Sequence, residues 1–271
     1  MPQWFLRLRV WIYYILSRPV NDFVRVFRFG LPFVLKKSEG YESTEADALR
    51  YLNSQFRGKN RLPIPKLYDA IALDGDTYTL MSRLPGQSIM EVGSTGKLPF
   101  TEEFFDSIAK QVEAILRRVW ALEQPAHIRG KAMISASGGG VLTDYNYGDS
   151  LMGPYDNVLD YYAMAAGFGD GPTLIRYYPE VEHTFPADRI VFTHADPFLQ
   201  NTLISTDGRV CGIVDWENAG WFPMEYQWRL LQSLHPCTKL PYKRAWDRLQ
   251  VSEETLASRA LIRRIQAEHP L

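Results

Sequence analysis

The chain has 271 residues, of which 46% are hydrophobic and 23% charged, and its 30 basic residues nearly balance its 31 acidic ones. This composition is that of an ordinary globular protein and excludes collagen-like, disulfide-scaffold and wholly disordered chains. A formal net charge of −1 provides no general attraction to nucleic acid, so no nucleic-acid partner is expected. The chain has two cysteines and no Cys/His cluster typical of zinc, which indicates a reducing compartment, the cytoplasm.

The first residues form an apolar segment that is interrupted by arginines. Residues 4–16 read WFLRLRVWIYYIL, with Arg7 and Arg9 inside the segment and Arg18 and Pro19 after it. A membrane-spanning helix needs about 20 nearly continuous apolar residues, so no transmembrane segment is predicted. The internal charges and the lack of a small-residue cleavage site also argue against a signal peptide. We predict an amphipathic helix packed on the domain, with a helix lying on a membrane surface as the alternative.

Charge is distributed unevenly along the chain. Residues 1–37 carry seven Lys and Arg against Asp22 alone, a local net charge of +6. Residues 141–187 carry seven Asp and Glu against Arg176 alone, a local net charge of −6, together with nine Tyr and Phe. Such an asymmetry indicates either two sites with different ligands or two solvated surfaces.

The first third of the chain is rich in predicted strands. Residues 23–37 alternate around a Gly30-Leu31-Pro32 turn, which is typical of a hairpin. A helical pattern opens at residues 43–45 and ends before Gly58. Residues 68–73 and 78–81 flank a turn signal and predict a second hairpin. The first 20 residues, before these strands, have the pattern of a helix. Leu84-Pro85-Gly86 then breaks the strand and is typical of a connector.

The rest of the chain is mainly helical in pattern. A long helix is predicted over 104–122, followed by loops over 125–157 with a glycine turn at 138–140. A strand over 190–193 and a hairpin over 202–214 come next. The sequence then has a helical pattern to the end, with Leu256, Leu261 and Ile265 as its apolar stripe. Strands followed by helices predict an α+β protein with two lobes. We place the division at residue 86, with a nucleotide-binding lobe over 1–86 and a helical lobe over 87–271.

The stretch that carries chemistry is FTHADPFLQNTLISTDGRVCGIVDWE at 192–217. Asp196 and Asn201 lie on one predicted loop, and Asp215 ends the hairpin that folds back beside it. Magnesium prefers such hard oxygen ligands, usually one or two from the protein with the rest from phosphates and water. Asn201 and Asp215 fit that role, which leaves Asp196 to orient and deprotonate a hydroxyl nucleophile.

The pattern HxDxxxxN followed by IxDWE resembles the catalytic loop and metal-binding segment of the aminoglycoside phosphotransferase and choline kinase group. IVDWENAGWFP at 213–223 is similar to the IIDWExAGWxP of fungal proteins in that group. FVLKK, EADALRYL, PIPKLYDA, YTLMSRLPG and MGPYDN follow in the expected order along the chain. The resemblance implies a protein-kinase-like fold with a small β-rich lobe and a larger helical lobe. It also implies transfer of the γ-phosphoryl of ATP, with Mg²⁺, to the hydroxyl of a small molecule.

The resemblance assigns a role to each matching residue. Asp196 matches the catalytic aspartate, and Asn201 and Asp215 match the magnesium ligands. Lys36 matches the lysine that holds the α- and β-phosphates, with Lys37 as the alternative. Glu45 matches the carboxylate that pairs with this lysine, with Glu42 as the alternative. The connector whose backbone receives adenine is matched by Met81, Ser82, Arg83 and Leu84.

Two departures from the family pattern bear on function. Ala195 stands where the loop usually has glycine, so a positive φ there would be strained. No glycine-rich turn for ATP phosphates is recognisable before Lys36, and Gly30 is the single candidate. The alternative function is therefore a kinase-like binding protein, inactive or adapted to another reaction. For an active enzyme, the acidic and aromatic residues 141–187 favour a cationic or aromatic amine alcohol as acceptor.

Overall fold

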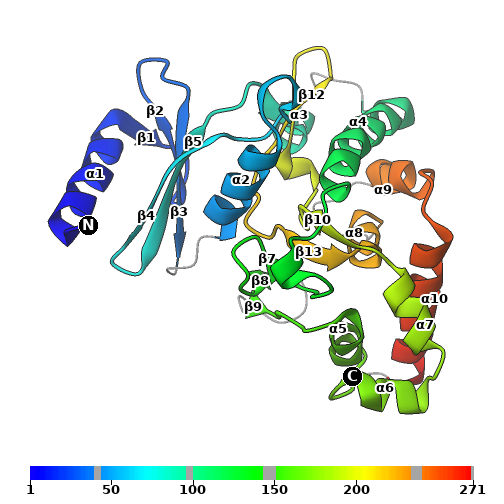
Figure 1. Ribbon diagram of the computed structural model, residues 1–271. Helices are drawn as coiled ribbons and strands as arrows, with labels where there is room; N and C mark the ends of the chain where they lie inside the picture. Colours follow the sequence, from blue (N-terminus) through cyan, green and yellow to red (C-terminus); the bar gives the residue numbers. More distant parts are fainter. Residues whose placement is uncertain (40–43, 96–99, 143–150, 233–239, 270–271) are drawn as a thin grey trace.

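The computed structural model describes residues 1–39, 44–95, 100–142, 151–232 and 240–269. A small lobe built on an antiparallel sheet is joined to a larger, mainly helical lobe (Figure 1). The predicted α+β class is therefore confirmed in these residues. None of the described helices combines the length and apolarity that crossing a bilayer requires.

The small lobe is one five-stranded sheet with a helix on each face. Its strand order is β1-β2-β3-β5-β4, with every neighbouring pair antiparallel. The elements are α1 (Gln3–Leu16), β1 (Ser17–Pro19), β2 (Val24–Phe27), β3 (Phe33–Glu39), α2 (Thr44–Gln55), β4 (Leu67–Leu73) and β5 (Asp76–Ser82). Strand β1 was not predicted, because three residues directly after a helix show no alternation of their own.

The two faces of this sheet are distinct because side chains alternate along each strand. Helix α1 packs on β4, where Val10 meets Ile71 and Leu73 beneath Tyr78. This packing confirms the predicted amphipathic helix. Helix α2 covers the opposite face, where Met81 joins the main core with the α2 residues Ala48, Leu49 and Leu52.

The chain enters the large lobe directly after the connector at residues 83–86. Strand β6 (Gln87–Ser88) pairs with β11 (Thr202–Ile204), which in turn pairs with β12 (Val210–Ile213). The predicted hairpin is thus the core of a three-stranded sheet. Helix α4 (Glu102–Trp120) packs beside it and buries its apolar stripe, which includes Phe105, Ile108, Val112, Leu116 and Val119.

The remaining elements complete the large lobe. They are α3 (Ile89–Thr95), η2 (Ala126–Ile128), β7 (Ile134–Ser135), β8 (Val141–Leu142), β9 (Leu151–Met152), α5 (Val158–Ala165), α6 (Gly171–Tyr177), α7 (Val181–Ala187), β10 (Ile190–Thr193), η3 (Leu199–Asn201), β13 (Gly220–Pro223), α8 (Met224–Leu231), α9 (Leu240–Asp247) and α10 (Glu253–Glu268). The short helix η1 (Gly58–Asn60) lies in the small lobe, between α2 and β4.

Two details of the large lobe differ from the sequence prediction. Strand β13 pairs with β10 and β7, whereas the sequence pattern predicted helix after residue 214. The Gly220 to Pro223 segment is fully buried, so tertiary pairing decides its conformation. In α10, Leu256 is 49% exposed, and the buried stripe is formed by Leu261, Ile262 and Ile265.

The connector ends in a tightly enclosed glycine, which generates the first prediction. Gly86 has φ +95°, and an added Cβ would lie 2.5 Å from the carbonyl oxygen of Ile204 and closer still to Cys211 Sγ. Gly75 has a similar φ of +91° in open space. We expect Gly86→Ala to lower the free energy of unfolding by about 3 kcal/mol and Gly75→Ala by about 1 kcal/mol. Equal losses in urea unfolding would contradict the role of close packing at the connector.

Candidate active site

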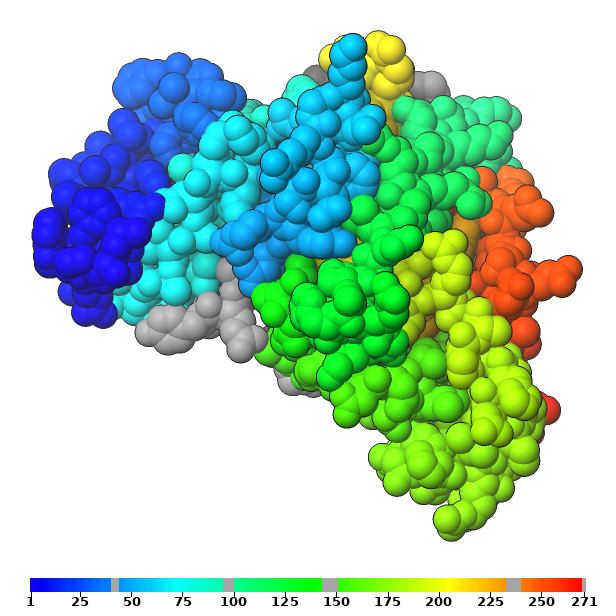
Figure 2. Space-filling model, viewed as in Figure 1, coloured from blue at the N-terminus to red at the C-terminus, as the bar shows by residue number. Residues whose placement is uncertain are grey.

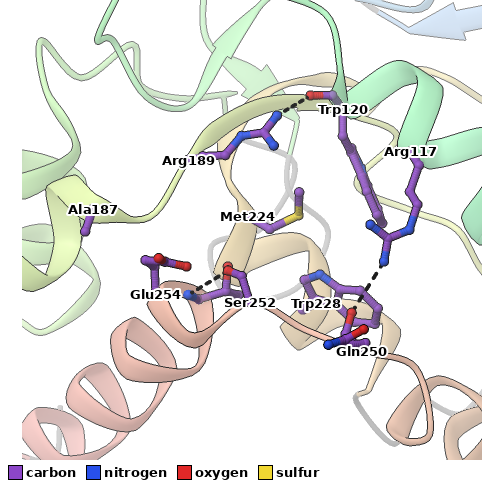
Figure 3. A pocket seen from close by; sticks show the side chains of 10 residues that line it. Arg117, Trp120, Ala187, Arg189, Met224, Trp228, Gln250, Ser252 and Glu254 are labelled. Carbon is purple, nitrogen blue, oxygen red and sulfur yellow. Dashed lines mark hydrogen bonds between the residues drawn. The ribbon is translucent and has the colours of Figure 1, made fainter.

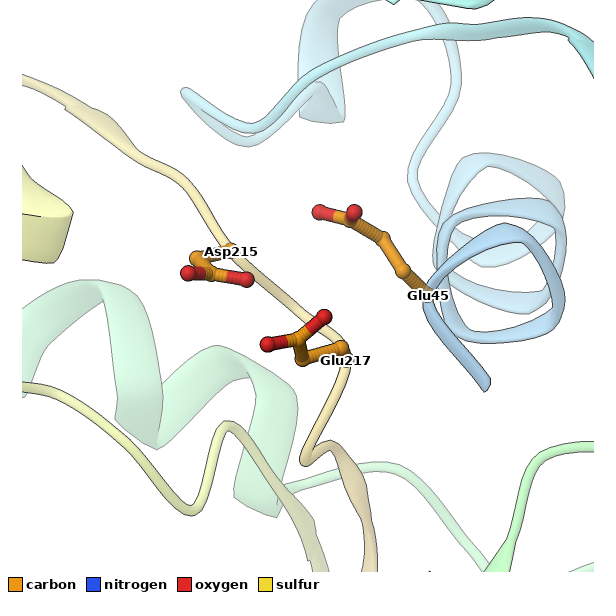
Figure 4. A group of neighbouring side chains, drawn as sticks. All are labelled: Glu45, Asp215 and Glu217. Atoms are coloured by element: carbon orange, nitrogen blue, oxygen red, sulfur yellow. The ribbon is translucent and has the colours of Figure 1, made fainter. Parts of the chain in front are cut away.

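A single lysine joins the two lobes through three carboxylates. Lys36 Nζ on β3 lies 3.3 Å from Glu45 Oε2 on α2, 2.5 Å from Asp215 Oδ1 and 2.8 Å from Glu217 Oε2. Figure 4 shows the three carboxylates converging from α2 and from the segment after β12. One oxygen from each lies within 4.8 Å of the others. The predicted pair of Lys36 with Glu45 is therefore present, and Asp215 lies against it.

Strand alternation decides between the two candidate lysines. Lys36 pairs with Thr79 on β5 and points to the α2 side of the sheet, whereas Lys37 pairs with Tyr78 on the α1 side. Lys37 accordingly forms an ion pair with Asp76, 2.9 Å away. Lys36 alone of the two meets the carboxylate cluster. The alternative glutamate, Glu42, lies outside the described residues.

The cluster has more negative than positive charge. Burial by itself would lower the pKa of Lys36, but Glu45, Asp215 and Glu217 outweigh it and hold that pKa well above its ordinary value. Lys36 is therefore an ammonium ion at any physiological pH. Burial raises the pKa of Glu45 to about 7 against the opposing effect of Lys36. Near pH 7 Glu45 is therefore partly protonated, but Asp215 and Glu217 still outnumber the one ammonium, which favours the arrival of further positive charge.

The catalytic-loop candidates are held by their own hydrogen bonds. Asn201 Nδ2 donates to Asp196 Oδ2 at 2.7 Å and to the Asp196 carbonyl at 3.0 Å. The Val214 N–H donates to the carbonyl of Asn201 at 2.9 Å, which ties the loop to the segment that carries Asp215. The structure thus brings together Asp196, Asn201 and Asp215, as the sequence predicted.

Two residues of this site adopt the left-handed backbone conformation that favours glycine. Ala195 has φ 61°, so the strain expected from alanine at this position is present, and Asp215 has φ 67°. Gln227 on α8 holds the first of them, since its Oε1 accepts from the Ala195 N–H and from the Thr193 hydroxyl. Tertiary contacts therefore sustain a conformation that the local sequence disfavours.

His194 is a structural residue in this arrangement. Its Nδ1 accepts from the Asp196 N–H at 3.1 Å, so its Nε2–H donates to the Val214 carbonyl at 2.8 Å. Its ring packs against Trp216, with centroids 4.5 Å apart, and the backbone N–H of Trp216 donates to Glu45 Oε1. Complete burial lowers the pKa of His194 to about 4. The neutral ring links the candidate catalytic loop to the lysine cluster.

Sequence reasoning assigned no role to two residues of the site. Glu217 lies two positions after Asp215 in the DWE motif, and that spacing was the available signal for a second carboxylate on the same side. Gln227 is remote from the loop in sequence, and no local pattern marks it.

The β1–β2 turn lies at the end of the sheet nearest Lys36, since Val24 pairs with Lys36. It contains no glycine. Its amides are used within the turn: the N–H groups of Val20 and Asn21 donate to the Val24 carbonyl, and those of Phe23 and Val24 donate to Asn21 Oδ1. Gly30 lies at the opposite end of β2 and is not part of this turn. The turn therefore offers few backbone donors to a phosphate.

The connector residues are only partly available to a ligand. Met81 is 5% exposed in the core, and the N–H groups of Ser82 and Arg83 donate to the carbonyls of Lys66 and Pro32. Leu84 is the remaining connector residue. A hollow beside the connector is lined by the 30–32 turn and by residues 83–86.

The acidic residues of the 141–187 segment are largely engaged in local structure. Asp156 pairs with Lys131, Glu180 pairs with Arg264, and Asp170 caps the start of α6. Most of the segment's described aromatic rings pack in the core, among them Tyr161, Tyr162 and Phe185. Asp144 and Asp149 lie outside the described residues. The charge argument for a cationic acceptor thus loses its support in the described part of this segment.

A separate hollow lies on the large lobe away from these residues. Figure 3 shows Trp120, Arg189, Met224, Trp228 and Ser252 among its lining, which comes from α4, the segment that joins α7 to β10, α8 and the start of α10. It contains none of the predicted site residues.

Comparison with known families agrees with the motif. Residues 152–227 match the model of the phosphotransferase enzyme family, a segment that includes Asp196, Asn201 and Asp215. The resemblance to the aminoglycoside phosphotransferase group is thereby confirmed. No curated protein matches the chain.

Solved structures establish the fold. A thermostable mutant of the aminoglycoside phosphotransferase APH(4)-Ia, in a ternary complex with AMP-PNP and hygromycin B, is 14% identical with a TM-score of 0.55, covering 95% of this chain and 86% of its own. The complex of gentamicin with APH(2″)-IIa is 11% identical with a TM-score of 0.53, covering 91% and 79%. The two-lobed, protein-kinase-like fold is confirmed by these likenesses.

The buried histidine generates the second prediction. The pKa of His194 is about 4 in the folded chain against an ordinary 6.5, so between these values the unfolded chain binds more protons. Stability therefore rises with pH across this window, and acidification from pH 6.5 to 4 costs about 3 kcal/mol. Urea unfolding of His194→Gln should lack this component of the pH dependence, whereas the exposed-site control His183→Gln should keep it. Equal pH slopes in wild type and His194→Gln would contradict the assignment.

Proposed function

We propose that this protein is an ATP- and Mg²⁺-dependent phosphotransferase that moves the γ-phosphoryl of ATP to a hydroxyl of a small molecule. The observation that carries the proposal is the joining of Lys36, Glu45 and Asp215 in one cluster beside the Asp196–Asn201 loop. Phosphoryl transfer is catalysed mainly by positioning and charge neutralisation, and these groups supply both.

The donor set fits a magnesium ion. Asp215 and Glu217 provide carboxylate oxygens. The amide nitrogen of Asn201 donates to Asp196, which leaves the amide oxygen of Asn201 as the ligand atom. Hard oxygen ligands and excess negative charge are what Mg²⁺ selects. Bound there with ATP, the ion would neutralise charge on the phosphates. Glu217 is thus added to the ligand candidates Asn201 and Asp215.

Lys36 and Asp196 have two separate roles in the proposed reaction. Lys36, held by Glu45, would exchange part of its carboxylate contacts for the α- and β-phosphates of ATP. Asp196 would accept the hydrogen bond of the acceptor hydroxyl, orient its oxygen in line with the γ-phosphorus and take its proton. The Asn201 hydrogen bond fixes the Asp196 carboxylate for that task.

The nucleotide would lie between the lobes, with its base near the connector. Of the four connector candidates Met81, Ser82, Arg83 and Leu84, we assign the adenine contact to the backbone of Leu84, because the Ser82 and Arg83 N–H groups are already bonded. The lobes would then divide at residue 86, with nucleotide contacts contributed mainly by residues 1–86 and acceptor contacts by residues 87–271.

The acceptor is proposed only as a hydroxyl-bearing small molecule. Hygromycin B and gentamicin are bound by the structurally similar proteins, which supports an acceptor of this general size. A cationic or aromatic alcohol remains within the proposal. The engaged carboxylates of the 141–187 segment do not select it.

The β1–β2 turn favours a second candidate, a kinase-like protein that binds a ligand without transferring phosphate. Its internally bonded amides reduce the expected affinity for nucleotide phosphates. Isothermal titration with ATP and Mg²⁺ separates the two. Absence of binding at millimolar nucleotide would favour this second candidate.

Replacing the proposed base gives the third prediction. Asp196→Asn keeps the size of the side chain and its hydrogen bond to Asn201, so folding and nucleotide binding should persist. Turnover should fall about 10²- to 10⁴-fold, the usual effect of a lost general base. The measurement is ATP consumption with a hydroxyl acceptor found by screening, with the exposed-turn variant Asp207→Asn as control. Turnover near that of the wild type would exclude Asp196 as the base.

Replacing the proposed metal ligand gives the fourth prediction. Asp215→Ala removes a carboxylate from the cluster, so the Mg²⁺-dependent part of ATP binding should be lost in calorimetry. Because Lys36 keeps Glu45 and Glu217, the thermal melting of the variant should stay cooperative. Asp207→Ala is the matched control. An unchanged affinity for Mg-ATP in Asp215→Ala would rule out Asp215 as a ligand.

A further inference from the structure

The residue before the proposed base is held in a conformation that its own side chain disfavours. Ala195 has φ 61°, in the left-handed region that disfavours a residue with a Cβ by about tenfold. It is 6% exposed and packs in the core of the large lobe. A change of φ at this residue would swing the chain that follows, and Asp196 is the next residue. The direction of the Asp196 carboxylate therefore depends on what holds Ala195.

The side chain of Gln227 on α8 bridges the start of this loop. Its Oε1 accepts from the Ala195 N–H at 3.4 Å and from the Thr193 hydroxyl, on the two sides of His194. A backbone N–H can only donate, so the amide atom that faces it is the oxygen. The Thr193 hydroxyl in turn accepts from Trp120 Nε1–H at 3.1 Å, which leaves its own hydrogen for Gln227. One oxygen thus ties the loop to α8 and, through Thr193, to α4.

This network is closed to solvent. Thr193 and Gln227 are both fully buried. Thr193 ends β10, where it pairs with Gly220 of β13. Figure 2 shows atoms of α2, α4 and the segment after α4 over most of the place where Figure 1 shows β13. A lost protein acceptor at this depth is therefore not readily replaced by water.

The position of Gln227 uses the oxygen of the amide and not its nitrogen. Within the part of the chain that the structure describes, Gln227 Nε2 has no hydrogen-bond acceptor. A buried donor without an acceptor is costly, so an apolar side chain of the same size would fill this space better if packing were the whole role. What this position supplies is thus an acceptor oxygen for the loop.

We propose that Gln227 is a positioning residue, whose side-chain oxygen keeps residue 195 left-handed and thereby aims the Asp196 carboxylate. The inference rests on the proposed function, in which Asp196 takes the proton of the acceptor hydroxyl. Gln227 acts through the backbone before Asp196, whereas Asn201 holds the Asp196 side chain. The two restraints act on different bonds, and both are needed for a fixed base.

Loss of this oxygen should affect turnover more than nucleotide binding. Without it, Ala195 would relax toward negative φ, and a misdirected base lowers kcat about tenfold or more. Lys36 and Asp215 lie on other segments, so the affinity for Mg-ATP should stay within about threefold. Glycine adopts positive φ as readily as negative φ. With glycine at position 195, the loop should therefore no longer depend on Gln227.

The experiment combines two changes at Gln227 with one at Ala195. Gln227→Met keeps the volume and removes the acceptor, whereas Gln227→Glu keeps an acceptor oxygen. Each is made alone and together with Ala195→Gly. The rate measured is phosphate release from Mg-ATP with water as the acceptor, and calorimetry gives the affinity for Mg-ATP. Gln227→Met should lower kcat about tenfold or more beside Ala195 but less than about threefold in the Ala195→Gly protein, and Gln227→Glu should stay within about threefold.

A second glutamine of the same helix end provides the control. Gln232 follows α8 and accepts from Arg259 through its Oε1. Gln232→Met should lower the melting temperature without lowering kcat. Thermal melting of every variant separates a loss of folding from a loss of positioning.

Crystal structures of the variants give a readout that needs no activity. Residue 195 should have negative φ in Gln227→Met and keep its positive φ in Gln227→Glu. A positive φ retained in Gln227→Met, or an equal loss of kcat with alanine and with glycine at position 195, would overturn the proposal. If the wild type releases no phosphate while φ responds as expected, the phosphotransferase function fails and the role of Gln227 in holding the loop stands.

Discussion

The structure depends on one ammonium group shared among three carboxylates. Lys36 reaches from the small sheet to Asp215 and Glu217 of the large lobe, and Glu45 on α2 supports it from behind. Lys36 and Glu45 are nearly buried and depend on each other as partners, whereas Asp215 and Glu217 are about one-third exposed. The same cluster retains excess negative charge, and burial raises the pKa of Glu45 to about 7. An interaction that joins the lobes thus also prepares the site for a cation.

Hydrogen bonds hold the candidate catalytic loop in a strained backbone conformation. Ala195 and Asp215 both have positive φ, and Gln227 holds the first through its backbone N–H. Neutral His194 connects the Asp196 backbone to Val214, and Trp216 connects His194 to Glu45. A chain of contacts therefore runs from the loop to the lysine cluster. Rigid positioning of this kind is what phosphoryl transfer requires.

The small sheet separates two surfaces of different chemistry. On the α2 side, Lys36 faces carboxylates, and on the α1 side, Tyr78 and Ile71 support a helix whose outer face is apolar. Strand alternation makes this possible, because consecutive residues such as Lys36 and Lys37 point to opposite faces. The fold can thus keep a charged cluster and an exposed apolar surface apart within a single sheet layer.

The sequence alone determined the class of fold and pointed to the candidate site residues Asp196, Asn201 and Asp215, because these three lie close together in the chain and their spacing is local. The same holds for α2, α4 and the two hairpins, because a short stretch of sequence is enough to show the periodicity of each. Only the tertiary structure decided which lysine meets Glu45, since that depends on the register of β3 against β5. It likewise decided the pairing of β13, the support of Ala195 by Gln227 and the partners of the acidic residues. These are contacts between segments far apart in the chain, and no local pattern encodes them.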